Sequence, residues 1–375
     1  MLPYGHQSIN EDDIDAVAAV LRGDWLTTGP AVTDFEEALA AYVRAPRVVT
    51  ATSGTAALHM AYAAAGVGPG DEVITTPITF VATASCATAL GATVRFADVE
   101  PDTANIDPDA VAALVGPATK VVAGVDYAGQ PVDIDRLNEI AHAAGALTVQ
   151  DAAHSIGSLV GDRPVGSIAD LTTFSFFPTK NMTTAEGGAV AALDPALAQR
   201  VHEFHFIGLV RDRTRLRHPD EGPWHQEVHA WGLNYRLSDV HCALGLSQLK
   251  RLQAFKEARE EIFERYQDAF AAVPGLGCHG VRDGVDPTWH LYPVRIRDGR
   301  RREVFERMRG AGIGVQVNYL PVYRHPLYED LGYRPGLCPN AEAFYAEELS
   351  LPMYADLTQA DQERVIETLL EIIGS

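Results

Sequence analysis

Residues 171–180 read Leu171-Thr172-Thr173-Phe174-Ser175-Phe176-Phe177-Pro178-Thr179-Lys180. The run over residues 171–176 is short and rich in aromatic and β-branched residues, which predicts a buried strand. Lys180 comes just after this strand and is followed by a small-residue stretch that ends at Ala189. Surroundings of low dielectric would lower the pKa of its amine and make it a nucleophile able to form a Schiff base. Taken alone, an ordinary loop lysine is the more common case.

Similar short apolar runs occur on both sides of this strand and alternate with helical patterns. Such alternation predicts an α/β fold with a mainly parallel seven-stranded sheet that is covered by helices on both faces. The expected strands are residues 47–51, 72–76, 93–97, 120–125, 146–150, 171–176 and 189–192. The expected helices are residues 10–22, 35–44, 54–66, 80–90, 108–115, 134–144 and 195–206.

The C-terminal part of the chain has a different pattern. One long helix is expected over residues 238–270, and it would lead out of the sheet domain. After it we expect a strand at 289–295 and helices at 341–349 and 358–373. The sequence therefore predicts a large domain over residues 1–250, including the N-terminal helix, and a smaller α+β domain over residues 251–375.

Composition limits the classes of partner. The formal net charge of −20 repels nucleic acid and anionic lipid, so neither is an expected partner. No apolar run is long enough to span a membrane, and the N-terminus lacks the pattern of a signal peptide. The four cysteines lie far apart, without a CxxC pair, which favours a reducing cytoplasm.

Two further polar groups follow expected strands. Asp151 and His154 come after the strand at 146–150, where a carboxylate can pair with a cationic ring nitrogen. Ser53, Gly54 and Thr55 come after the strand at 47–51 and open a helix, where backbone N–H groups can bind a phosphate. Each group alone is as well explained by an ordinary helix cap.

The three groups together are far more specific, because ligands of such sheets bind at the carboxyl ends of the strands. A phosphate cradle, a partner for a ring nitrogen and a nucleophilic amine are the set that pyridoxal 5′-phosphate (PLP) requires. We therefore expect a PLP site. The pairs His202/His205 and His225/His229 have spacings that could suit a metal, but no third ligand is evident, so no metal site is expected.

Over essentially its whole length the chain resembles the DegT/DnrJ/EryC1/StrS family of sugar aminotransferases, which are fold-type I PLP-dependent transferases. Some stretches resemble the subgroup that aminates C4 of a UDP-linked 4-keto-6-deoxy-N-acetylhexosamine. Gln150 and Phe177 depart from common family residues near the cofactor. Asn318 departs from the histidine common in that subgroup and would lie closer to the substrate, so the exact sugar stays open. The family resemblance rests on residues 53–58, 75–80, 151–154, 174–180, 186–188 and 234–250, and the subgroup resemblance on 3–9, 183–190, 290–293 and 315–319.

The resemblance implies catalytic roles for Lys180 and Asp151. Lys180 would hold the cofactor covalently and later move a proton, while Asp151 would pair with the pyridinium nitrogen. His154 would lie near the ring hydroxyl, and Phe80 would stack on the ring.

The resemblance also implies a shared site. Gly54, Thr55 and Ser175 would hold the phosphate, and Asn234 of the partner subunit would reach it, so that the active site would belong to a homodimer. Glutamate would donate the amino group and a ketosugar would receive it, by a ping-pong mechanism through the pyridoxamine form. Amination of another ketosugar or an aminocyclitol in antibiotic biosynthesis is an alternative, and a PLP-bound regulatory protein without turnover is another.

Arg211, Arg213, Arg215 and Arg217 form a basic patch in an acidic chain. A solvated loop explains them, but arginine also suits the phosphate oxygens of a sugar nucleotide, so both interpretations stay open. The glycines of residues 66–70 precede a strand instead of following one, which argues against a dinucleotide site.

Overall fold

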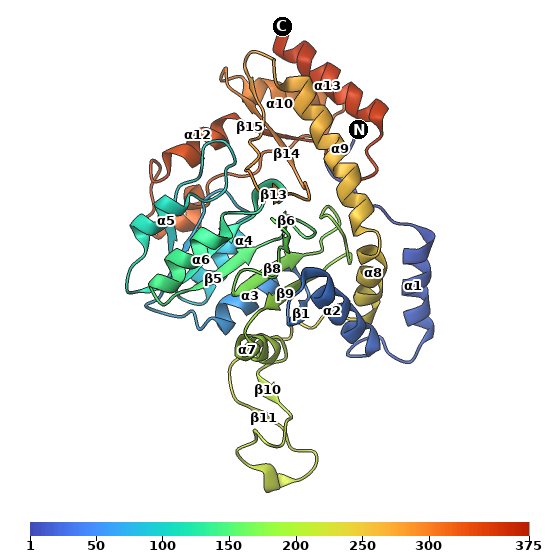
Figure 1. The fold of residues 1–375 in the computed structure, drawn as a ribbon, viewed down its shortest axis with the longest axis vertical. Helices are drawn as coiled ribbons and strands as arrows, with labels where there is room; N and C mark the ends of the chain where they lie inside the picture. Colours follow the sequence, from blue (N-terminus) through green and yellow to red (C-terminus); the bar gives the residue numbers. More distant parts are fainter. Residues whose placement is uncertain (375) are drawn as a thin grey trace.

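The computed structural model describes residues 1–374, and its centre is a sheet of seven strands in the order β1-β9-β8-β5-β4-β2-β3 (Figure 1). Strand β9 runs antiparallel to its two neighbours β1 and β8, and every other pairing in this sheet is parallel. All seven expected strands are present, with ends that differ by a residue or so. They are β1 (Arg47–Ala51), β2 (Glu72–Thr75), β3 (Thr93–Phe96), β4 (Thr119–Val125), β5 (Leu147–Asp151), β8 (Leu171–Ser175) and β9 (Gly188–Ala192).

Helices cover the sheet on both faces. Successive strand residues point to opposite sides of the sheet, and because the strands are apolar on both sides, both faces need a covering layer. In β1, for example, Val49 and Ala51 belong to one hydrophobic cluster and Val48 to another. The first cluster contains α3 (Gly54–Ala64), α4 (Ala82–Ala89) and α7 (Pro195–His205). The opposite face is covered by α2 (Pro30–Val43), α5 (Pro108–Leu114) and α6 (Ile134–Ala143). The expected doubly covered α/β sheet is therefore confirmed.

The prediction of a single helix over residues 238–270 is wrong. The chain forms α8 (Asp239–Leu249) and α9 (Leu252–Phe270), separated by Lys250 and Arg251. The amides of these two residues bond to carbonyls three residues back, which tightens the turn. Arg251 also pairs with Asp13, a buried carboxylate in α1 (Glu11–Arg22). This contact between distant segments explains why the break has no local sequence signal.

A second hydrophobic core lies beyond α9. A three-stranded sheet of β12 (Leu276–Gly277), β14 (Tyr292–Ile296) and β15 (Glu348–Leu351) packs with α9, α10 (Arg301–Gly310) and α13 (Gln359–Gly374). The helix expected over 341–349 is in fact α12 (Pro339–Glu347), since Glu348 turns to extended backbone and pairs with β14. The domain boundary expected near residue 250 stays a prediction.

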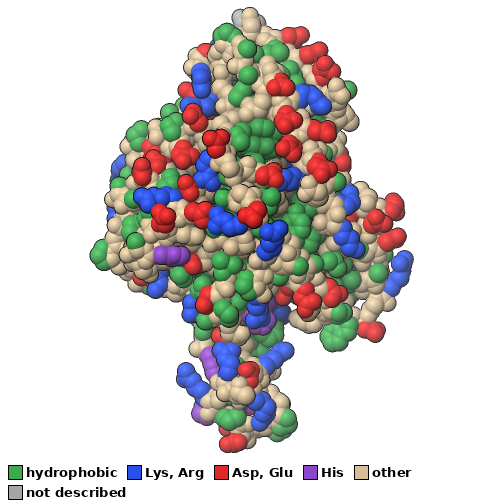
Figure 2. Space-filling view, viewed as in Figure 1, with side chains coloured by type: hydrophobic (Ala, Val, Ile, Leu, Met, Phe, Trp, Pro, Cys, Tyr) green, Lys and Arg blue, Asp and Glu red, His purple; other side chains and the backbone are tan. Residues whose placement is uncertain are grey.

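The remaining elements are short. Figure 1 shows one pair of them, β10 and β11, in a narrow arm that projects away from the sheet, and Figure 2 shows the same projection in space-filling form. No helix within residues 1–374 has the length and apolar character to cross a membrane. The short elements are β6 (Leu159–Val160), β7 (Arg163–Pro164), β10 (Leu209–Val210), β11 (Glu227–Val228), β13 (Val285–Asp286), α11 (Pro326–Asp330), and the 3₁₀ turns Tyr127–Gly129, Pro219–Glu221 and Val322–Arg324.

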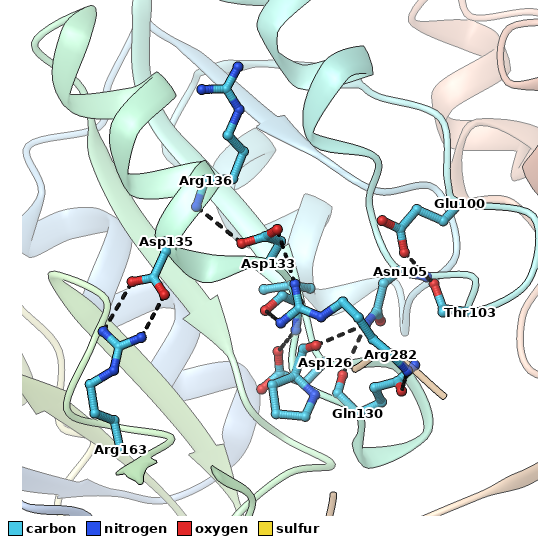
Figure 3. A network of polar contacts seen from close by, with 12 residues as sticks. Glu100, Thr103, Asn105, Asp126, Gln130, Asp133, Asp135, Arg136, Arg163 and Arg282 are labelled. Carbon is cyan, nitrogen blue, oxygen red and sulfur yellow. Dashed lines mark hydrogen bonds and ion pairs between the residues drawn. The ribbon is translucent and has the colours of Figure 1, made fainter. Parts of the chain in front are cut away.

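A polar network fixes the loop that follows β4 (Figure 3). Asn105 accepts a hydrogen bond from the amide of Tyr127 at 3.0 Å and donates to the carbonyl of Gln130 at 3.1 Å. Arg282 donates to the carbonyl of Val132 at 3.0 Å and pairs with Asp133 at 3.2 Å. The loop is thereby tied to two distant segments, which holds Tyr127 in place at the carboxyl end of the sheet.

Candidate active site

A cavity of about 370 Å³ lies at the carboxyl ends of the central strands. Seven of the eight residues expected to hold the cofactor line it: Gly54, Thr55, Phe80, Asp151, His154, Ser175 and Lys180. The eighth, Asn234, lies outside this cavity, exposed at the base of the arm, where it pairs with Phe206. The fold thus brings together side chains from four strand ends that lie far apart in the sequence.

Lys180 reaches the cavity from the loop after β8. Burial lowers the pKa of its amine to about 8, while the charge of Asp151 acts in the opposite direction. A larger fraction of this amine is therefore neutral near pH 7 than for an exposed lysine, and a neutral amine is the form that attacks a carbonyl carbon.

Asp151 is the last residue of β5 and is almost fully buried. Its carboxylate accepts hydrogen bonds from the hydroxyl of Thr83 at 2.7 Å and the amide of Ala153 at 3.2 Å. Burial nevertheless raises the pKa of Asp151. A cationic group placed in the cavity would offset this cost of burial, so the carboxylate suits a protonated ring nitrogen.

Gln150, which precedes Asp151 and differs from the residue common in the family, hydrogen-bonds a carboxyl group of its own. Its amide donates to both carboxylate oxygens of Asp126, at 3.1 and 3.0 Å. Asp126 also accepts from the hydroxyl of Ser155 at 2.5 Å and is fully buried. Burial raises the pKa of Asp126 to about 7. A glutamine therefore supplies donors that this buried carboxyl requires.

The N-terminus of α3 forms another wall. A Cβ at Gly54 would lie 2.8 Å from the Cβ of Ser175, so only glycine permits this close approach of helix and strand. The side chain of Ser53 caps the amide of Ala56, whereas the hydrogen bonds found in residues 1–374 include no acceptor for the amides of Gly54 and Thr55. A cradle suited to an anion is thus formed by the free amides of Gly54 and Thr55, the hydroxyls of Thr55 and Ser175, and the positive end of the α3 dipole.

Aromatic rings complete the cavity. The ring of His154 lies 4.3 Å from that of His290 and 6.4 Å from that of Tyr319, and burial lowers the pKa of His154 far below its ordinary value. Phe80 meets Tyr319 edge to face at 6.5 Å, and 60% of its surface is exposed. Burial also lowers the pKa of His290 far below its ordinary value, so both imidazole rings are neutral near pH 7. Phe80 keeps much of its ring surface open.

Asn318, the residue that left the exact sugar open in the sequence, does line the cavity. Sequence reasoning assigned no role to four other cavity residues, namely Tyr4, Thr83, His290 and Tyr319. Three of these four come from the N-terminal segment or from the part of the chain after α9, and their approach depends on the packing of the two cores. Only Thr83 had a usable signal, since it follows Phe80 by three residues at the start of a helix.

The model of the DegT/DnrJ/EryC1/StrS aminotransferase family matches residues 7–370. The chain belongs to this family. Among curated relatives, the spore coat polysaccharide biosynthesis protein SpsC of Bacillus subtilis is 39% identical over 99% of this chain and 97% of its own length. The UDP-4-amino-4,6-dideoxy-N-acetyl-beta-L-altrosamine transaminase of Campylobacter jejuni is 38% identical, covering 100% of this chain and 98% of its own.

Solved structures agree with this assignment. Helicobacter pylori PseC, an aminotransferase involved in the biosynthesis of pseudoaminic acid, superposes with a TM-score of 0.92 at 31% identity, over 100% of this chain and 99% of its own. Spr1654 of Streptococcus pneumoniae in its PLP-form has a TM-score of 0.93 at 30% identity, over 100% of this chain and 98% of its own. This family member is therefore a PLP-dependent sugar aminotransferase of fold-type I.

The cavity fits the cofactor of the family. The free amides of Gly54 and Thr55 suit its phosphate, the buried carboxylate of Asp151 suits its ring nitrogen, and the lowered pKa of Lys180 suits a covalent attachment to its aldehyde. Nδ1 of His154 is buried and has no hydrogen-bond partner within the described chain, so a polar group of the cofactor would satisfy it.

Proposed function

We propose that this enzyme transfers an amino group from glutamate to a nucleotide-linked 4-keto-6-deoxy sugar, in two half-reactions that use the same cavity in turn. The observation that carries the proposal is the gathering of Lys180, Asp151 and the α3 cradle around one cavity. The choice of sugar is supported by relatives that are 37–38% identical and that carry the name of a UDP-aminosugar transaminase.

The cavity residues expected around the cofactor each have a proposed part. PLP bound in this cavity would supply an electron sink for the negative charge left when the substrate loses a proton. Lys180 holds the cofactor through Nζ and, once released, carries a proton at Nζ between carbon atoms. Asp151 keeps a proton on the ring nitrogen by its negative charge. Gly54, Thr55 and Ser175 bind the phosphate.

Two aromatic groups orient the ring in the same proposal. Phe80 covers one face of the ring, for which its exposed surface at the entrance leaves room. His154 lies near the ring hydroxyl, and its buried Nδ1 is available for a polar contact. Both side chains would also exclude water from the reacting atoms.

A homodimer is also part of the proposal. Asn234 lies outside the cavity of its own chain, and the arm beside it exposes Trp224, Val228 and Trp231. Asn234 of the partner subunit would complete the phosphate cradle. The four cysteines are free thiols, which supports the proposed cytoplasmic setting.

Absorption spectroscopy tests the first half-reaction. Purified holoenzyme is expected to be yellow because the bound cofactor absorbs visible light. Adding glutamate should remove this absorption band as the pyridoxamine form accumulates. A yellow protein that reacts with no amino donor would favour the regulatory alternative. Turnover of UDP- and dTDP-linked ketosugars and of an aminocyclitol ketone, with the amine position read by NMR, then identifies the acceptor.

A further inference from the structure

Tyr4 and Asn318 lie side by side in the cavity wall formed by the N-terminal segment and the C-terminal core. The N-terminal segment is fixed there by backbone hydrogen bonds, from the amide of Met353 to the carbonyl of Tyr4 at 3.1 Å and from the amide of Gly314 to the carbonyl of Leu2 at 2.8 Å. The proposed roles around the cofactor use neither side chain.

A chain of hydrogen bonds fixes the orientation of the Asn318 side chain. The amide Nδ2 donates to the hydroxyl oxygen of Tyr4 at 2.7 Å and to the hydroxyl oxygen of Ser350 at 3.1 Å. The hydroxyl of Ser350 donates in turn to the carboxyl of Glu348 and so is free to accept. The backbone amide of Asn318 donates to the other oxygen of Glu348 at 2.7 Å. An Asn318 side chain turned by 180° would place Oδ1 beside Ser350, whose hydroxyl hydrogen already goes to Glu348, so that the contact with Ser350 would be lost.

This orientation determines what the two side chains offer to a ligand. The oxygen of Tyr4 already accepts from Asn318, so the hydroxyl hydrogen of Tyr4 remains to be donated. Besides Asn318, Tyr4 has the hydroxyl of Ser350 as a side-chain partner. No other acceptor for the Tyr4 hydrogen, and no donor to Oδ1 of Asn318, occurs among the side-chain hydrogen bonds of residues 1–374, although both residues line the cavity. The wall thus presents one donor and one acceptor next to each other.

We propose that Tyr4 and Asn318 form a binding site for a single sugar hydroxyl, which accepts from Tyr4 and donates to Asn318. A hydroxyl matches this pair because it is both donor and acceptor, whereas a ketone oxygen only accepts. The inference rests on the proposed function. A 4-keto-6-deoxy-N-acetylhexosamine linked through C1 has one free ring hydroxyl, at C3, next to the carbon that receives the amine. The pair therefore selects sugars that carry the 3-hydroxyl.

The test compares two substrates in each variant, the UDP-linked 4-keto-6-deoxy-N-acetylhexosamine and its 3-deoxy analogue. Wild type is expected to prefer the hydroxylated sugar by about 30-fold in kcat/KM, because the analogue leaves the polar pair unmatched. In Tyr4→Phe the preference should fall to about threefold or less, with most of the loss on the hydroxylated sugar. Ser350→Ala removes an acceptor that orients Asn318 and should reduce the preference to an intermediate value.

Tyr127→Phe is the matched control. The hydroxyl of Tyr127 donates to the backbone carbonyl of Asn318 at 2.6 Å and does not line the cavity, so this variant disturbs the same segment from behind. It can lower both rates, but the ratio between the two sugars should stay at the wild-type value. A role of Tyr4 in folding alone would instead give Tyr4→Phe and Tyr127→Phe the same ratio.

The outcomes separate this inference from the function on which it rests. Turnover of both sugars by wild type at equal kcat/KM, or an unchanged preference in Tyr4→Phe, would overturn the hydroxyl site and leave the aminotransferase function standing. A holoenzyme that glutamate converts to the pyridoxamine form but that aminates neither sugar would overturn both the proposed acceptor and the site.

Discussion

The cavity and the arm are held together in different ways. Cavity residues such as Asp151 and Asn318 have partners from several distant segments, and most of their polar atoms are satisfied within the chain. The arm has two paired strands of only two residues each, and Trp224 and Trp231 are 76% and 70% exposed at its surface. A single chain thus builds a nearly complete cavity, whereas its arm leaves aromatic rings exposed. Exposed aromatic rings of this kind are typical of a surface that contacts another molecule.

Charged side chains give the arm its internal order. The carboxylate of Glu227 accepts from the amides of Arg217 and His218 at 2.7 and 2.6 Å. It also pairs with His225 at 3.2 Å and His229 at 2.5 Å. These contacts shape the loop without burying apolar surface. The comparison predicts that changes in the cavity act on chemistry, while changes in the arm act on assembly.

The largest effect is expected from Lys180→Ala. Turnover should fall by at least 10²–10⁴-fold, roughly the contribution of positioned proton transfer alone. The yellow band of the holoenzyme should shift as well, because the covalent attachment is lost. Steady-state kinetics and absorption spectra check this, and analytical ultracentrifugation should show an assembly state like that of wild type. Residual turnover above a few per cent would contradict the assignment of Lys180.

A second test targets the arm with Trp224→Ser and Trp231→Ser combined. If the arm contacts a second copy, the double variant should dissociate at higher protein concentration than wild type and lose about tenfold in kcat/KM, since buried aromatic residues dominate interface energies. Leu331→Ser, at a body position that is 55% exposed, is the matched control. Equal sedimentation of wild type and the double variant as dimers at all concentrations would argue against the arm as the interface, and sedimentation of both as monomers would argue against the dimer.

The sequence predicted the sheet well because parallel strands and their covering helices leave strong local patterns. The sequence pattern also located three of the proposed cofactor residues, because Gly54, Asp151 and Lys180 each come just after a strand that could be predicted. The break between α8 and α9 and the strand at Glu348 were missed, because both depend on contacts with partners far away in the sequence, Asp13 for one and β14 for the other. Tyr4 and Asn318 meet for the same reason, 314 positions apart.

The buried carboxyls of Glu348 and Asp126, which bond to Asn318 and Gln150 beside the cavity, should make stability depend on pH. Burial raises the pKa of Glu348 to about 8, so between about pH 5 and pH 8 the folded state keeps a proton that the unfolded state releases. The free energy of unfolding therefore falls as pH rises through this window, with a limiting slope of about 1.4 kcal/mol per unit from this group. Asp126, whose pKa burial raises to about 7, adds a slope of the same sign.

Urea unfolding of wild type and Glu348→Gln between pH 5.5 and 7.5 measures this contribution. The variant is expected to be less stable at low pH, but its stability should decline less steeply, by about 1 kcal/mol per unit. The slope is informative even if the variant loses hydrogen bonds, because such a loss shifts the curve without changing its gradient. Parallel curves would show that Glu348 is ionised throughout the window.

The smallest effect is expected from Arg213→Ala in the arm. Its guanidinium already donates to the carbonyl of Gly222 at 3.2 Å and to that of Pro219 at 2.7 Å, which favours a role in shaping the arm. The KM for the nucleotide sugar should then change by less than about threefold, since an exposed polar contact is worth under about 1 kcal/mol. Arg211, which lies over the ring of Phe206 at 4.8 Å, should behave alike. A rise in KM of tenfold or more that weakens with added salt would instead assign these arginines to the phosphates, because a screened charge contact has that dependence.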